Sequence, residues 1–169
     1  MKPSQVIKVI ALTLGCTALA FSGPHGRTVA VRAHAGPSFA FTPTADPYVF
    51  KATVNGVAQF SLLGNCTDQA ELEVRFPASP GQPVLLNGSG TFTSSDGTTT
   101  LSFTLTGSAT PDPSNPAFFN SKYELTFTGG SGALASATGS AEIEEVVLFT
   151  SPLTGSASWV LEGRVTTRR

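Results

Sequence analysis

Three glutamates close together in one stretch of the chain are the residues whose types and spacing most directly suggest chemistry. Side chains along a strand alternate between two faces, so Glu142 and Glu144 share one face. Glu145 falls in phase with the apolar Ile143 and Val147, which would point it toward a core. A buried carboxyl group has a raised pKa and can act as an acid or a base. Glu145 is therefore the candidate catalytic residue; the alternative is a bulge or register shift that leaves all three glutamates in water.

Other catalytic and metal-binding arrangements are missing from the sequence. Both histidines, His25 and His34, lie in an N-terminal segment that we expect to precede the folded domain, and no Gly-x-Ser-x-Gly motif occurs. A serine nucleophile would therefore lack a histidine base, and zinc would lack histidine ligands in the folded domain. Asp96 and Asp112 are not part of a spaced acidic series of the kind that binds calcium. We expect no metal and no cofactor.

The N-terminus has the pattern of a secretory signal peptide. Lys2 and Lys8 precede an apolar run over residues 9–20, which is too short to cross a membrane as a helix. No second apolar run of that length follows, so we expect an exported protein, secreted or periplasmic, without an integral membrane span. Cleavage is expected after Ala20, and the alternative site is after Ala35.

Each cysteine raises one further question. Cys16 could carry a lipid anchor, as in bacterial lipoproteins, but the leucine before it is one place too far upstream, and we interpret Cys16 as an apolar residue of the leader. Cleavage after Ala20 would leave Cys66 alone, which excludes an intramolecular disulfide. We expect a buried thiol there, and the alternative is a disulfide between two molecules.

The charge balance excludes one class of partner. The chain has ten Lys and Arg against eleven Asp and Glu, and loss of the leader would remove Lys2 and Lys8 from the basic set. The mature protein would be mildly acidic and has no basic stripe to neutralise phosphates, so we expect no nucleic-acid binding.

Hydrophobic alternation divides the rest of the chain. Residues 21–46 are rich in Gly and Pro without a sustained period, which predicts a flexible segment, and residues 47–167 are predicted to form the domain. Within it, Asn55-Gly56 predicts a hairpin turn followed by a strand over 57–63. The three prolines within 110–116 predict the longest loop.

Eight strand-like runs joined by turns, with no helix to cover a sheet, predict an all-β fold. We expect an eight-stranded antiparallel up-and-down barrel, and the alternative is a two-sheet β-sandwich. The inward aromatic residues are candidates to line a ligand cavity: Phe76, Phe103, Tyr123, Phe127 and Trp159. The alternative is that these side chains simply fill the core of so narrow a barrel.

The stretch 125–139 reads Leu-Thr-Phe-Thr-Gly-Gly-Ser-Gly-Ala-Leu-Ala-Ser-Ala-Thr-Gly. It resembles the glycine signature of allene oxide cyclase-like and dirigent-like β-barrels, which include uncharacterised bacterial exported proteins. Gly129, Gly130 and Gly132 would allow positive φ in a sharp turn, after which Gly139 would begin the next strand. Ala133-Leu134 stands where the family has Arg-Phe.

The resemblance implies a barrel whose interior binds an apolar fatty-acid epoxide or a phenolic radical. We therefore expect an exported β-barrel that holds a small apolar or aromatic ligand. The first alternative is an isomerase or cyclase that uses Glu145. The second is a structural surface or matrix module, which the Thr- and Ser-rich outer faces would suit. The oligomeric state stays open.

Overall fold

The computed structural model describes residues 26–79 and 81–168, and almost all of them are in strands. The predicted leader lies outside the described residues, and so do Cys16 and the predicted cleavage site after Ala20. The elements in chain order are β1 (Arg27–Ala35), β2 (Ser38–Pro43), β3 (Val49–Phe60), β4 (Gly64–Arg75), β5 (Val84–Ser94), β6 (Thr100–Asp112), β7 (Asn115–Gly130), the short helix η1 (Gly132–Leu134), β8 (Thr138–Ser151) and β9 (Thr154–Thr167).

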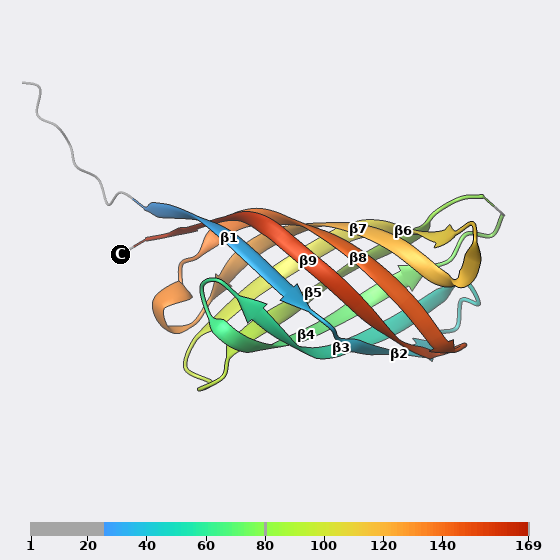
Figure 1. The fold of residues 1–169 in the computed structure, drawn as a ribbon, viewed down its shortest axis with the longest axis horizontal. Coiled ribbons are helices and arrows are strands. Elements are labelled where there is room, and N and C mark those ends of the chain that lie inside the picture. The colour runs from blue at the N-terminus through green and yellow to red at the C-terminus, as the bar shows by residue number, and fades with distance from the viewer. Residues whose placement is uncertain (1–25, 80, 169) are drawn as a thin grey trace, which may run out of the picture.

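The sheet closes on itself, which confirms the up-and-down barrel and makes the sandwich wrong. From β3 to β9 each strand pairs antiparallel with the next in sequence, and β9 returns to β1 and β2 (Figure 1). β1 and β2 both lie between β9 and β3, and β2 continues the pairing register of β1 on both neighbours. The two segments therefore act as one interrupted strand, and the barrel has eight strand positions.

The interruption between β1 and β2 lies at Gly36-Pro37. Pro37 has no N–H to donate, but its carbonyl accepts a hydrogen bond from Ala157 N at 2.9 Å, so the pairing with β9 persists across the break. On the other side, a Cβ placed on Gly56 would lie 2.7 Å from Pro37 Cα. Glycine at position 56 thus makes room for the proline.

The expectation of a flexible segment over 21–46 is wrong for residues 27–43, which form β1 and β2. The inward face of β1 carries small alanines, including the buried Ala33 and Ala35. The hydrophobic contrast between the two faces of β1 is therefore weak, and the alternation did not indicate a strand. His34 lies on the exposed outer face of β1, so the folded domain does contain an imidazole.

Two predicted connections are also wrong. Asn55-Gly56 is not a turn, because both residues pair with β4 in the middle of β3; the chain turns before Gly64, which has a φ of +67°. Long cross-strand pairing outweighs the local turn preference there. The predicted loop at 110–116 is mostly strand, since β6 runs to Asp112 and β7 begins at Asn115.

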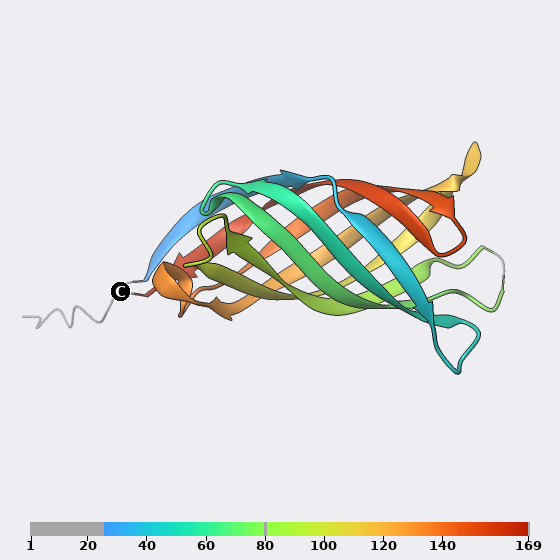
Figure 2. The same cartoon turned by 90° about the horizontal axis from the view of Figure 1, so that it is seen from below.

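The two ends of the barrel differ (Figures 1 and 2). One end is covered by the segment around η1, where Leu134 is buried against the core. Gly129 and Gly132 have positive φ, as expected, and Gly139 near the start of β8 has one that was not predicted, whereas Gly130 does not. Gly130 is instead needed for close approach, because a Cβ there would lie 2.0 Å from Thr100 O. No helix within the described residues is long and apolar enough to cross a membrane.

Candidate ligand-binding cavity

The end of the barrel opposite η1 carries a group of phenylalanines that we call the aromatic mouth. Neighbouring rings lie with centroids 5.2–6.1 Å apart, mostly tilted or edge-to-face, the geometry that aromatic pairs prefer. All but Phe39 remain partly exposed. The six residues are Phe39, Phe41, Phe50, Phe76, Phe119 and Phe149.

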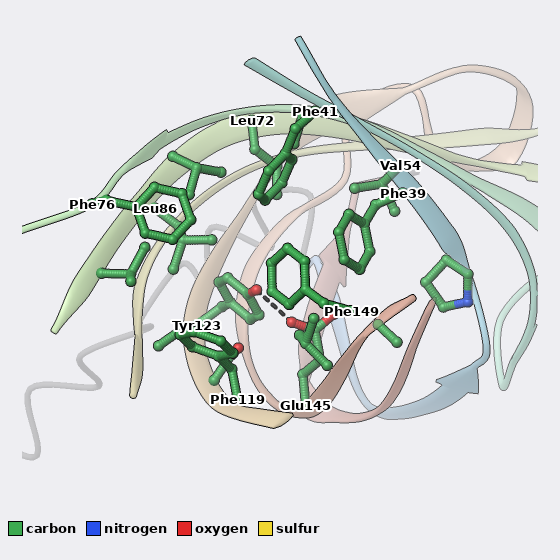
Figure 3. A pocket seen from close by; sticks show the side chains of 18 residues that line it. Phe39, Phe41, Val54, Leu72, Phe76, Leu86, Phe119, Tyr123, Glu145 and Phe149 are labelled. Carbon is green, nitrogen blue, oxygen red and sulfur yellow. Dashed lines mark hydrogen bonds between the residues drawn. The ribbon is translucent and has the colours of Figure 1, made fainter. Parts of the chain in front are cut away.

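Below the mouth lies an outer cavity of about 60 Å³. Its walls are apolar, and its few polar side chains are Ser121, Tyr123 and Glu145 (Figure 3). An inner cavity of about 40 Å³ follows deeper in the barrel and is also lined by Tyr123 and Glu145, together with Asp68 and Trp159. Tyr123 and Glu145 therefore stand between the two cavities.

The strand alternation around Glu145 holds without a bulge. Ser121 and Tyr123 on β7 face inward, and β8 pairs with β7 in one unbroken register, so Glu145 points inward as well. Glu144 points outward, where Lys122 Nζ lies 2.8 Å from its Oε1. Inside, the Tyr123 hydroxyl donates a hydrogen bond to Glu145 Oε2.

Burial controls the protonation of this pair. Desolvation raises the pKa of Glu145, and the charge of Asp68 adds to the rise, while the Tyr123 hydroxyl opposes it. The pKa of Tyr123 rises well above its usual value, first by desolvation and then through the charge of Glu145. Tyr123 therefore stays a hydrogen-bond donor, and Glu145 can exchange a proton at a higher pH than an exposed glutamate.

Asp68 is a second interior acid that the sequence analysis missed. It is 4% exposed, and desolvation raises its pKa to about 6, while the nearby Trp159 indole favours the charged form. The alternation of Ala70, Leu72 and Val74, extended back by one step, would have placed Asp68 inside. Its neighbour Cys66 is the buried free thiol, and burial raises its pKa to about 11.

Ser121 is a polar residue of the outer cavity without a partner. The residue is 2% exposed, and its Oγ has no hydrogen-bond partner among the described residues. The hydroxyl lies near Tyr123 and Glu145 and favours their charged forms, which opposes the rise that desolvation causes in the pKa of both groups. Buried hydroxyls normally have a partner. Ser121 thus offers a free donor and acceptor to whatever enters.

The five aromatic candidates separate by position. Phe76 and Tyr123 line the outer cavity, and Phe103, Tyr123 and Trp159 line the inner one. Phe127 lines neither; it packs against Phe60 at the η1 end, where side chains fill the core. The mouth residues of β2 were not predicted from the sequence, because that segment was assigned to a flexible region.

Comparison with known proteins shows the fold. No family model and no curated protein matches the chain. Among solved structures, the chain is similar to the pterocarpan synthase dirigent protein GePTS1, with a TM-score of 0.51 and 12% sequence identity over 88% of this chain and 90% of that one. The protein therefore has a dirigent-like β-barrel fold.

Proposed function

We propose that this protein is an exported barrel that binds a small apolar or aromatic molecule at its aromatic mouth without converting it. The observation that carries the proposal is the group of partly exposed rings above the outer cavity. A ligand that covers these apolar rings removes them from water, and this burial makes the free energy of binding more favourable. A patch of that kind on a soluble protein marks an interaction site.

The volumes constrain how the ligand lies. An engineered apolar cavity of roughly 150 Å³ accommodates benzene, whereas the outer cavity here is about 60 Å³. A ring would therefore lie among the mouth phenylalanines, and only a small substituent would reach Tyr123 and Glu145.

A fluorescence titration with the neutral apolar dye Nile red tests this function. We expect saturable binding that weakens roughly two- to tenfold in the double variant Phe41→Ala/Phe149→Ala, because each lost ring contact removes aromatic packing. The control is Val57→Ala/Val160→Ala, which removes two exposed apolar side chains from the outer surface. Equal weakening in both variants, or no saturable binding to the wild type, would refute the proposal.

Export is part of the same proposal, with the leader removed after Ala20. A cut there would leave β1 whole, because β1 begins at Arg27. A cut after Ala35 would remove β1 and its pairing with β9. Mass spectrometry of the protein recovered from outside the cytoplasm should give an N-terminus at Phe21; an intact leader on that protein would contradict the proposal.

A second candidate function is an isomerase or cyclase of the allene oxide cyclase-like type. The observation that favours it is the inward position of Glu145, whose raised pKa suits acid–base chemistry. Cyclisation of an unsaturated fatty-acid epoxide needs no co-reactant, so the purified protein can be incubated with the epoxide alone. The measurement is the ratio of the product enantiomers. An excess of one enantiomer that Glu145→Gln abolishes would support this function, and a racemic product would contradict it.

A further inference from the structure

We infer that the polar end of the ligand is a cationic amine, whose ammonium group binds between Glu145 and Ser121 at the base of the outer cavity. This inference rests on the proposed function, because it specifies the ligand of the same mouth. The ligand class is then a lipophilic amine: an apolar or aromatic body with one protonated nitrogen.

The first argument is the uneven distribution of charge between the two faces of the barrel. Every basic side chain that the structure describes is exposed, namely Arg27, Arg32, His34, Lys51, Arg75, Lys122, Arg164 and Arg168. The two cavities are lined by two acids, Asp68 and Glu145, and by no base. A carboxylate in an apolar interior is costly unless a cation accompanies it. A ligand cation would supply the missing partner.

The second argument is the free hydrogen-bonding capacity at the cavity base. An ammonium group has only donors, so it needs acceptors around it. Tyr123 donates to Glu145 Oε2, which leaves Oε1 as an acceptor, and the unpartnered Ser121 Oγ can accept as well. Both groups line the outer cavity. A carboxylate ligand would instead meet two acids of its own sign.

The third argument is the wall of the cavity. Phenylalanine rings attract a cation to their faces, and the attraction is larger where water is excluded. Phe39, Phe41, Phe119 and Phe149 line the outer cavity together with Glu145 (Figure 3). A neutral alcohol would gain the contact with the rings but little of this electrostatic term.

The pH dependence follows from the groups that face Glu145. These are Tyr123 from β7 and, across the inner cavity, Asp68 from β4, with Cys66 beyond it. The phenol and the thiol have raised pKa values and stay neutral near pH 7, so the two acids govern the site. Amine affinity should therefore fall as the pH drops from 7 to 5, the range in which Asp68, with a pKa of about 6, loses its charge, while the affinity of a neutral alcohol should not.

Isothermal titration calorimetry with three ligands of similar shape tests the inference: phenethylamine, phenethyl alcohol and hydrocinnamate. At pH 7 we expect the amine to bind roughly tenfold or more tightly than the alcohol, because it gains a charge-assisted hydrogen bond, and the anion to bind least. Glu145→Gln should remove most of the preference, and Ser121→Ala part of it. Glu144→Gln, one residue away on the outer surface, should retain it.

The outcomes separate the inference from the function beneath it. Saturable binding of the alcohol with no preference for the amine, or a preference that Glu145→Gln leaves intact, overturns the inference and keeps the proposed function. Absence of saturable binding for all three overturns both. If Glu145→Gln does not fold, Ser121→Ala and the pH dependence of the wild type decide, and equal affinities for the amine at pH 5 and pH 7 overturn the inference.

Discussion

Asp68 and Glu145 are the residues that distinguish this barrel interior from a purely apolar core. Both lie on inward strand positions where a hydrophobic side chain would stabilise the fold more. Each has a raised pKa because burial disfavours its charged form. Keeping two acids there makes the stability of the barrel depend on pH.

Asp68→Asn should flatten that dependence. The pKa of Asp68 is 3.8 when exposed and about 6 when folded, so the cost of ionising it is absent below about pH 4 and complete above about pH 7. The difference between these two pKa values corresponds to on the order of 3 kcal/mol of unfolding free energy. Denaturant unfolding at both pH values should show the stability of Asp68→Asn relative to wild type rising by that order as the pH rises.

Glu144→Gln is the control with the opposite sign. Lys122 lowers the pKa of Glu144, so this carboxylate contributes stability that is lost as the pH falls. Because Glu144 is exposed, the effect should be small. A difference between Asp68→Asn and wild type that stays constant from pH 4 to pH 7 would contradict the buried position of Asp68.

Of the two interior acids, Glu145 could be predicted from the sequence and Asp68 was not. Glu145 could be placed by its phase with Ile143 and Val147, since period two is a strong signal in a long strand. Asp68 was missed because β4 begins at Gly64, earlier than the clean alternation from Ala70 indicated. The hydrogen bond between Tyr123 and Glu145 depends on the register between β7 and β8, which a single sequence does not specify.

Among the elements, the break between β1 and β2 depends on a glycine in the neighbouring strand β3. Gly56→Ala would place a methyl group 2.7 Å from Pro37 and should destabilise the barrel by about 1–3 kcal/mol. The matched control is Gly36→Ala, where the nearest atom would be 3.8 Å away. Urea unfolding of the two variants should differ; equal loss of stability would show that Pro37 does not pack on Gly56.

Leu134 is the buried side chain of η1, in the segment that covers one end of the barrel. Leu134→Ala removes a leucine that is 6% exposed and should cost about 2–5 kcal/mol, because it leaves a cavity above the core. Leu153→Ala removes an exposed leucine from a turn at the opposite end and should cost far less. Thermal unfolding compares them, and a small loss for Leu134→Ala would mean that η1 does not seal the barrel.

Local patterns predicted most strands but not their ends. The alternation of Leu101, Phe103 and Leu105 was clear, and β6 lies there. Asn55-Gly56 has the residues of a tight turn, yet the twelve-residue pairing of β3 with β4 passes through it. Turn preferences are local, whereas pairing energy accumulates over a whole strand, and only the closed sheet determines which of the two prevails.

For the whole molecule, closure is the property that removes exposed strand edges. β1 joins β9 to β3, so its loss would leave both with unpaired backbone groups. A chain beginning at Phe21 should be folded and monodisperse, whereas one beginning at Gly36 should aggregate. Light scattering and circular dichroism check this, and a soluble, equally stable shorter chain would contradict the contribution of β1 to closure.

The position of a bound ligand shows most directly whether the aromatic mouth is the binding site. Intermolecular nuclear Overhauser effects between phenethylamine and the isotope-labelled protein locate the bound molecule without any substitution. We expect contacts from the ligand ring to Phe41 and Phe149 and from its aminomethylene protons to Tyr123. Contacts confined to Val57 and Val160 on the outer surface would contradict it.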